Sequence, residues 1–167
     1  MADVLPLVRE NLARWPAAAG GTPVLINLSE NHTFRVDGDG GVRHVLRLNR
    51  PHYQSRGAIG SELAWLEAIT DDTDIPVPRP IPGADGDIVQ EVAPDRYAAL
   101  FAFEPGVEPQ PDADLAPLFA TLGRYAATLH NHVATWTQPE KFVRPIWDAA
   151  GILDPAGPWG DWRAAPH

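Results

Sequence analysis

One arginine in this sequence stands where its charge could hold an anion. Arg47 lies in the middle of the apolar run 42–49, which predicts a strand. Because strand side chains alternate, Val45, Arg47 and Asn49 share one face of that strand, and His44, Leu46 and Leu48 share the other. A guanidinium in apolar surroundings costs free energy unless an anion meets it. The sequence therefore predicts an anionic partner for Arg47.

A glutamate on the next predicted helix is the candidate partner. Glu62 lies three residues after Ile59 and four before Leu66, so it falls on the apolar stripe, whereas Glu67 lies off it. We therefore predict that Arg47 and Glu62 turn inward and pair. Two simpler interpretations stay open: a salt bridge with no further role, or an arginine whose stem lies on apolar surface while its head reaches water.

Two backbone features could add binding groups. The segment 29–33 joins two short predicted strands, and such a turn can aim backbone N–H groups at a phosphate, with Ser29 and Asn31 adding side-chain donors. Most turns of this kind bind nothing. The segment 100–106 runs from a strand into Pro105-Gly106, and its unpaired backbone groups could bond a planar base. The alternative is a plain interdomain linker.

These residues need a sheet and a helix to position them, and hydrophobic periodicity predicts both. We expect an α+β fold with five antiparallel strands and one helix inserted after the third. The proline-rich segments 75–86 and 104–114 are predicted to be an extended connection and a linker. The expected helices are 3–15, 55–69 and 115–135, and the expected strands are 24–28, 33–36, 42–49, 87–92 and 97–103.

The longest predicted helix carries its apolar residues at helical spacing, which predicts one buried stripe. The stripe comprises Leu115, Leu118, Phe119, Leu122, Tyr125, Ala126, Leu129 and Val133. His130 and His132 lie two apart on this helix and point about 200° away from each other. They cannot share a metal ion there, and the sequence predicts no metal site.

Composition excludes several classes of function. Asp and Glu number 22 against 13 Lys and Arg, a net charge of −9, which disfavours nucleic acid as a partner. There is no cysteine, so thiolate chemistry and disulfides are excluded. The longest apolar run, 98–103, is too short for a membrane span, and residues 1–10 do not form a secretory signal. The expected location is the cytoplasm.

Five segments together resemble the aminoglycoside phosphotransferase family, which includes choline-kinase-like and homoserine-kinase-like enzymes and has a protein-kinase-like fold. The segments are Ser-Glu-Asn-His-Thr-Phe-Arg-Val (29–36), Val-Leu-Arg-Leu-Asn-Arg-Pro (45–51), Ser-Glu-Leu-Ala-Trp-Leu (61–66), Phe-Glu-Pro-Gly (103–106) and Leu-Gly-Arg-Tyr-Ala-Ala-Thr-Leu-His (122–130). They occur in the family's order and extend over nearly the whole chain. The resemblance implies ATP as the cofactor, with magnesium expected only in a full-length relative.

The resemblance also implies a role for each matching residue. Arg47 matches the third-strand cation that binds the ATP phosphates, and Glu62 the helix carboxylate that pairs with it. Ser29 to Asn31 match the loop that covers the phosphates, and Val45 would lie over the adenine. Ala102, Phe103 and Glu104 match the hinge where the base bonds to backbone.

The family's catalytic loop, His-x-Asp followed by Asn, has no counterpart in this sequence. We therefore expect a kinase-like N-terminal lobe over 1–104. Residues 105–167 would hold the linker, the long helix and the Trp- and Pro-rich start of an incomplete C-terminal lobe. No catalytic residue is assigned. The chain would be a truncated gene product, a fragment or one half of a split enzyme, inactive alone.

The expected function is the ATP-binding portion of an enzyme that transfers the γ-phosphate to a hydroxyl of a small molecule. The alternatives are a non-catalytic module that binds nucleotide or protein, and an inactive remnant. The expected partners are a small-molecule substrate in a full-length form, and either a complementary C-terminal lobe or a second copy of the chain. Nucleic acid and membrane are not expected as partners.

Overall fold

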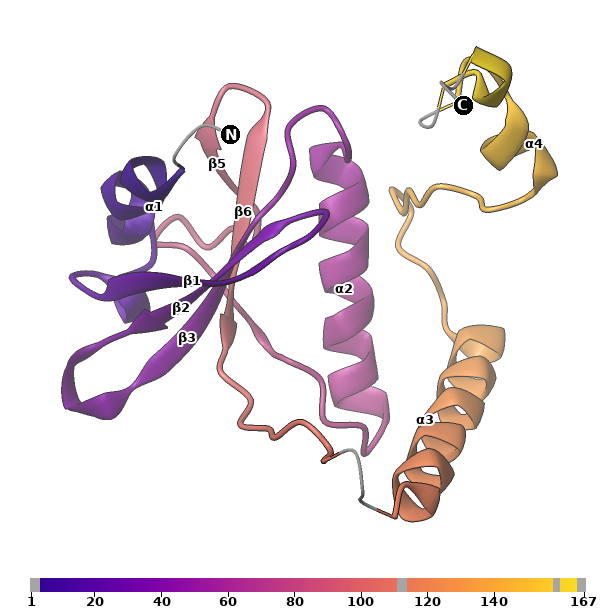
Figure 1. Cartoon of the computed structure of the whole chain (residues 1–167), viewed down its shortest axis with the longest axis horizontal. Helices are drawn as coiled ribbons and strands as arrows, with labels where there is room; N and C mark the ends of the chain where they lie inside the picture. Colours follow the sequence, from indigo (N-terminus) through magenta and orange to yellow (C-terminus); the bar gives the residue numbers. More distant parts are fainter. Residues whose placement is uncertain (1–3, 111–113, 158–159, 165–167) are drawn as a thin grey trace.

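A computed structural model describes residues 4–110, 114–157 and 160–164. The part that it describes forms layers, with α1 on one face of a sheet and α2 on the other, and with α3 and α4 beyond α2 (Figure 1). The helices are α1 (Leu5–Asn11), α2 (Arg56–Asp72), α3 (Ala116–Thr135) and α4 (Ala149–Leu153).

The sheet is antiparallel throughout and holds six strands within the described residues, in the order β1-β2-β3-β6-β4 with β5 also on β6. The strands are β1 (Thr22–Leu28), β2 (His32–Asp37), β3 (Arg43–Leu48), β4 (Pro80–Ile81), β5 (Gln90–Ala93) and β6 (Arg96–Ala102). The strand that carries Arg47 is therefore an interior strand, hydrogen-bonded to β2 and β6 on its two sides.

The sixth strand corrects the prediction of five. It is β4, a two-residue strand inside the predicted extended connection, and it pairs Pro80 with Phe101 and Ile81 with Leu100. Proline has no N–H to donate, so it is tolerated at the edge of a sheet, where β4 lies. A strand of this length leaves no alternating pattern in the sequence.

The hairpin between β2 and β3 sets which side chains lie together. Gly40 and Gly41 take φ of 68° and 81°, which L-residues rarely adopt, and they close the turn. The resulting register pairs Thr33 with Arg47. The alternation along β3 is as predicted, because Leu46 and Leu48 are buried in the cluster that also holds α1, while Val45 packs against the cluster that holds α2.

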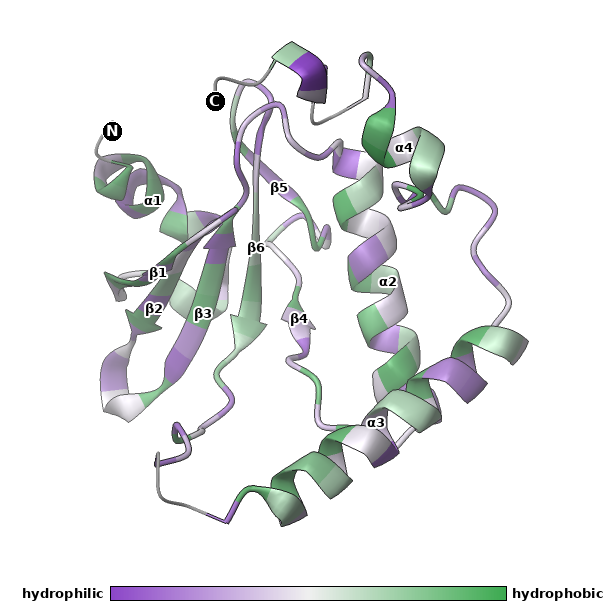
Figure 2. Ribbon diagram, turned by 45° about the vertical axis from the view of Figure 1, so that its right-hand side comes forward, coloured by the Kyte–Doolittle hydropathy of each residue, from purple (hydrophilic) through white to green (hydrophobic). Residues whose placement is uncertain are grey.

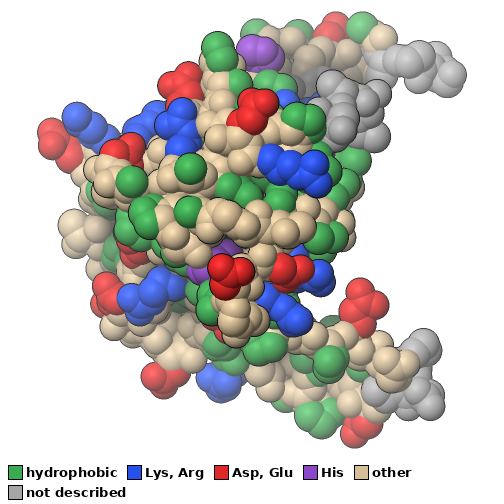
Figure 3. All heavy atoms as spheres, turned by 90° about the vertical axis from the view of Figure 1, so that its left-hand side faces the viewer, with side chains coloured by type: hydrophobic (Ala, Val, Ile, Leu, Met, Phe, Trp, Pro, Cys, Tyr) green, Lys and Arg blue, Asp and Glu red, His purple; other side chains and the backbone are tan. Residues whose placement is uncertain are grey.

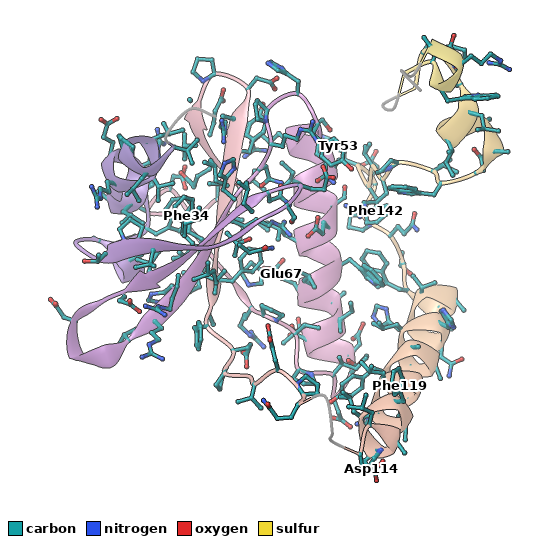
Figure 4. All side chains as sticks on the ribbon, in the orientation of Figure 1. Phe34, Tyr53, Glu67, Asp114, Phe119 and Phe142 are labelled. Carbon is teal, nitrogen blue, oxygen red and sulfur yellow. The ribbon has the colours of Figure 1, made fainter. Side chains whose placement is uncertain are left out.

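Each face of the sheet has its own apolar core. The cluster on the α1 face includes Phe34, which lies among the strands in Figure 4, and the fully buried Trp15. The cluster on the α2 face joins Ile59 and Leu63 of the helix to the sheet. In Figure 2, hydrophobic colouring covers most of β6 and recurs along α2. Because both faces of β3 are packed, the strand holds Arg47 in one position.

Helix α2 begins at a capping serine. The Oγ of Ser55 accepts a hydrogen bond from the N–H of Ala58 (3.1 Å), which satisfies one of the donors free at a helix start. The helix runs to Asp72, beyond the predicted end at Ile69. Glu62 lies in its first half, on the side that faces the sheet.

Helix α3 is where expectation and structure differ most. The predicted stripe was expected to be buried, but Phe119 is 64% exposed, and Leu122 and Val133 are 49% and 50% exposed. The buried residue of α3 is His132, which lies in the contact with α2. Helical periodicity shows which face of a helix is apolar, and a separate element must cover that face before it is buried.

The C-terminal segment contains α4, which the sequence analysis did not predict. Asp148 caps it, since its Oδ1 accepts from the N–H of Gly151 (2.7 Å).

No helix in the described ranges is both long and apolar enough to cross a membrane. On the molecular face shown in Figure 3, acidic and basic side chains are interspersed. Trp159, part of the predicted Trp- and Pro-rich segment, lies outside the described residues.

Candidate functional site

A pocket of about 260 Å³ lies between the α2 face of the sheet and the segment before β4. Its walls come from β2, β3, β6 and α2, so elements far apart in the sequence meet there. The lining residues are Thr33, Val45, Arg47, Leu66, Pro78, Phe101, Ala102 and Glu104. Most of the wall is apolar, and the two charged residues are Arg47 and Glu104.

Arg47 and Glu62 meet at this pocket, as the sequence predicts. The Nη1 of Arg47 donates to the Oε1 of Glu62 at 2.5 Å, and the two side chains are only 20% and 22% exposed. An ion pair this far from water is screened less than a surface pair. The carboxylate therefore fixes the direction of the guanidinium.

The remaining donors of Arg47 indicate what kind of ligand the pocket could bind. Its Nε and Nη2 are buried and have no hydrogen-bond partner. Its guanidinium carbon lies 5.2 Å from the centre of the Phe101 ring. A buried donor without an acceptor costs about 1–3 kcal/mol, so such atoms in a pocket indicate a missing acceptor. A guanidinium with two free donors matches the oxygens of a phosphate.

The predicted hinge residues divide. Ala102 and Glu104 line the pocket, whereas the ring of Phe103 lies 5.7 Å from the guanidinium carbon of Arg43. The N–H of Ala102 donates to the carbonyl of Arg79 (3.0 Å), so it is already used within the sheet. The N–H of Glu104 has no backbone acceptor within the described part of the chain. The N–H of Phe103 has no such acceptor either, so Glu104 is the pocket-lining residue of the three whose backbone donor is unused within the described residues.

The predicted phosphate-covering turn lies apart from the pocket wall. Ser29 and Asn31 sit between β1 and β2, and neither lines the pocket. The N–H of Ser29 donates to the carbonyl of Asn31 (3.1 Å), and Glu30 pairs with Arg50 at 3.0 Å. The turn is therefore closed on itself, and the role of Ser29 and Asn31 stays a prediction.

Four pocket residues were missed by the sequence analysis: Thr33, Leu66, Pro78 and Phe101. Thr33 could have been found, because the glycine-rich turn between β2 and β3 sets the register that places Thr33 opposite Arg47. Pro78 could not, because the segment that carries it has no periodic pattern.

Two further basic side chains close to β3 have lowered pKa values, and both lie in the row of side chains that faces α1. Burial lowers the pKa of His32 below its usual value, and the charge of Arg96 lowers it further. Burial also lowers the pKa of Arg96. The Nε and Nη2 of Arg96 and the Nδ1 of His32 are buried without a partner. These groups point away from the pocket, because His32 alternates with Thr33 along β2.

No group of three or more His, Asp or Glu side chains is placed to hold a metal ion within the residues that the structure describes.

His132 contacts α2 through both ring nitrogens. Trp65 donates from Nε1 to the Nδ1 of His132 (3.4 Å), and the Nε2 of His132 lies 3.0 Å from Asp72. His132 thus joins α3 to α2.

An antiparallel sheet with one inserted helix, and a cation on its third strand paired to a carboxylate of that helix, define the small lobe of a kinase-like phosphotransferase. Residues 24–160 match the model of the phosphotransferase enzyme family. The chain belongs to this family.

Two solved structures are similar to this chain. The microcompartment-associated aminopropanol kinase is 36% identical, with a TM-score of 0.81, and the match covers 96% of this chain and 50% of that kinase. An amicoumacin kinase in complex with AMP-PNP, Ca²⁺ and Ami has a TM-score of 0.75 at 18% identity, covering 92% and 47%, and this likeness shows the fold alone. No curated protein matches the chain. The chain spans about half the length of the two solved kinases.

Proposed function

We propose that this chain is the ATP-binding part of a kinase that transfers the γ-phosphate of ATP to a hydroxyl of a small molecule. One observation carries the proposal: the two unpartnered buried donors of Arg47 at a pocket between the sheet and α2. Membership of the phosphotransferase family supports ATP as the ligand, because a relative of the same fold was solved with AMP-PNP.

Each residue of the pocket has a proposed task. The adenine lies against Val45 and Leu66, and the free N–H of Glu104 bonds its edge. Nε and Nη2 of Arg47 bind phosphate oxygens, and Glu62 keeps the guanidinium turned toward them. ATP supplies the phosphoryl group, and magnesium would be held by residues beyond those assigned here.

The acceptor is proposed to be a small molecule with a hydroxyl group. The solved relatives are named as kinases of aminopropanol and amicoumacin. The sequence has no His-x-Asp to take the proton of such a hydroxyl. We therefore propose that residues 1–167 bind ATP without transferring its phosphate.

Calorimetric titration of the chain with ATP and with adenosine tests the proposal. We expect ATP to bind at least tenfold more tightly than adenosine, because only ATP gives Arg47 its acceptors. The difference should shrink as salt is raised, since it is electrostatic. Equal affinities for the two ligands would contradict a phosphate site at Arg47, and an absence of ATP binding would overturn the proposed function.

The second candidate function, binding to another protein, rests on the exposed apolar stripe of α3. Leu118, Phe119 and Leu122 are 41%, 64% and 49% exposed, and their exposure favours a surface that another protein covers. Figure 2 shows the apolar colouring along α3, and Figure 4 places Phe119 on this helix. The partner is either a counterpart of the unmatched half of the aminopropanol kinase or a second copy of this chain.

For the isolated chain we expect concentration-dependent association, which Phe119→Asp should reduce severalfold because it places a charge in the apolar stripe. Sedimentation velocity measures the change. Ala120→Asp is the matched control, since Ala120 is exposed and lies two positions, and so about 200° around α3, from both Leu118 and Leu122. Equal association of both variants would show that the stripe does not make the contact.

A further inference from the structure

The residues that follow α3 return along α2 toward the ATP pocket. This return segment, residues 136–147, begins at Trp136, which stacks on His132 with ring centres 5.9 Å apart. Phe142 meets Trp136 edge-on at 5.3 Å, and Figure 4 shows Phe142 beside α2. The N–H of Val143 then donates to the Oγ of Ser61 at 2.8 Å. The segment is thus held by α3 at its start, through His132, and by α2 at Val143, through Ser61.

Ser61 is held in place by α2 to accept this hydrogen bond. It is buried, with 6% of its surface exposed, and its hydroxyl also donates to the carbonyl of Gly57 (2.8 Å). A hydroxyl that donates inside a helix keeps its lone pairs for an outside donor. The N–H of Val143 takes one of them, which sets the position of the next residue, Arg144.

Arg144 is placed by this contact beside Glu62. Its Nη1 lies 3.4 Å from the Oε2 of Glu62, while the Oε1 of the same carboxylate accepts from Arg47 at 2.5 Å. The two oxygens of Glu62 are therefore divided between two guanidinium groups. One belongs to the ATP pocket and the other to a segment 82 positions away in the sequence.

We propose that Arg144 is a positioning residue of the ATP site: it holds the Oε2 of Glu62, so that Oε1 is presented to Arg47 and Nε and Nη2 of Arg47 stay turned toward the phosphates. The proposal rests on the proposed ATP-binding function and adds a residue to that site. Arg144 itself binds no phosphate and acts through Glu62.

The physical reason lies in the geometry of a carboxylate. A glutamate side chain rotates about its last bond, and one cation on one oxygen leaves that rotation poorly restrained. A second cation on the other oxygen restrains it. Without Arg144, the carboxylate could turn both oxygens to Arg47 and draw in a second N–H of the guanidinium, which would compete with the phosphate. The position of the return segment thereby influences how tightly the pocket binds ATP.

The simplest alternative is an ion pair without influence on the pocket. Arg144 is 38% exposed, and pairs of such exposure contribute little to stability. The two interpretations predict different effects of removing Arg144. If the pair has no influence on the pocket, the affinities for ATP and adenosine change equally or not at all. If Arg144 is a positioning residue, only the affinity for ATP, the ligand that carries phosphates, falls.

Titration of ATP and adenosine into Arg144→Ala tests the proposal. We expect ATP to bind about three- to fivefold more weakly, the size that a partly exposed ion pair supports, with adenosine unchanged. Arg144→Lys should recover part of the loss, since it keeps a charge near Oε2. In a Glu62→Gln background, Arg144→Ala should cause no further loss, because Arg144 acts through that carboxylate.

Arg163→Ala is the matched control. It removes the same charge from a residue that pairs with Asp161 at 3.6 Å and lies over Trp162, and it should leave ATP affinity unchanged. A loss in Arg144→Ala that persists in the Glu62→Gln background would reveal a long-range effect of charge and overturn the proposal. Unchanged ATP affinity in Arg144→Ala would overturn it too, with the proposed function intact.

Amide hydrogen exchange at Val143 gives a second measurement that needs no ligand. The N–H of Val143 should exchange slowly in the unaltered chain and rapidly in Ser61→Ala, and this variant should weaken ATP binding in the same direction as Arg144→Ala. Rapid exchange at Val143 in the unaltered chain would show that the return segment does not rest on α2, and would refute the proposal. If the unaltered chain binds no ATP, both the proposed function and this role of Arg144 fail.

Discussion

Replacing Arg47 with alanine is expected to weaken ATP binding by about 10- to 100-fold. The substitution removes the two donors, Nε and Nη2, that have no partner in the pocket. Hydrogen bonds to charged groups contribute about 1.5–3 kcal/mol, and about 1.4 kcal/mol corresponds to tenfold in affinity. Calorimetric titration measures the loss. Adenosine, which carries no phosphate, should bind the variant as it binds the unaltered chain.

Two variants separate the contribution of the planar, forked shape of the guanidinium from the contribution of its charge. Arg47→Lys keeps the charge but loses the planar fork, so we expect an affinity between those of the unaltered chain and Arg47→Ala. Arg9→Ala removes a charge from α1, on the opposite face of the sheet, and should leave the affinity unchanged. An ATP affinity that is equal in Arg47→Ala and the unaltered chain would take this residue out of the phosphate site.

The fold of Arg47→Ala should survive, so that its affinity can be interpreted. Glu62 loses Arg47 but retains Arg144 at 3.4 Å and is itself 22% exposed, so its charge is not left alone in the interior. Thermal melting of Arg47→Ala close to that of the unaltered chain checks this point.

The pair at the centre of the site could be predicted because it breaks a pattern. Arg47 interrupts an apolar strand and Glu62 interrupts an apolar helical stripe, and each violation requires a partner of opposite charge. The 2.5 Å contact between them shows that the inference holds across 15 positions of sequence. Alternation along a strand and the register of a hairpin extend this reasoning to Thr33.

Other contributions to the site could not be predicted, because they depend on where segments without periodicity go. Arg144 and Pro78 lie in stretches rich in proline, where no face can be assigned. The stripe of α3 shows the converse limit. Its period was identified correctly, yet Phe119 is exposed, because a period describes the helix and not its neighbours. The turn at Ser29 shows a third limit, since the direction of backbone N–H groups follows from local geometry that composition does not fix.

The opposite face of the sheet carries the largest expected effect on stability. Trp15 lies between two short 3₁₀ turns, Leu12–Arg14 and Pro16–Ala18, and is fully buried in the cluster that includes Leu46 and Leu48 of β3. We expect Trp15→Ala to lower the free energy of unfolding by about 3–5 kcal/mol, because removing a buried indole leaves a cavity. Urea unfolding measures the change.

Trp15→Phe distinguishes packing from polarity at the same position. The Nε1 of Trp15 is buried without a hydrogen-bond partner, which destabilises the folded state. Phenylalanine has no polar atom at this place and avoids that cost. The smaller ring leaves part of the space empty, so the two effects oppose each other, and we expect a net loss below about 2 kcal/mol. Trp162→Ala, at a side chain 54% exposed, should change stability by no more than about 0.5 kcal/mol.

This series also tests how the α1 face supports the proposed ATP pocket. Leu46 and Leu48 alternate with Arg47 on β3, so the packing of Trp15 on one face fixes the strand that presents the guanidinium on the other. Under conditions where Trp15→Phe is fully folded, its ATP affinity should equal that of the unaltered chain. A stability loss in Trp15→Ala below about 1 kcal/mol would mean that α1 and its following turns are not part of the cooperative unit. The position of β3 would then have to be set by the α2 face alone, through Val45 and the cluster around Leu63.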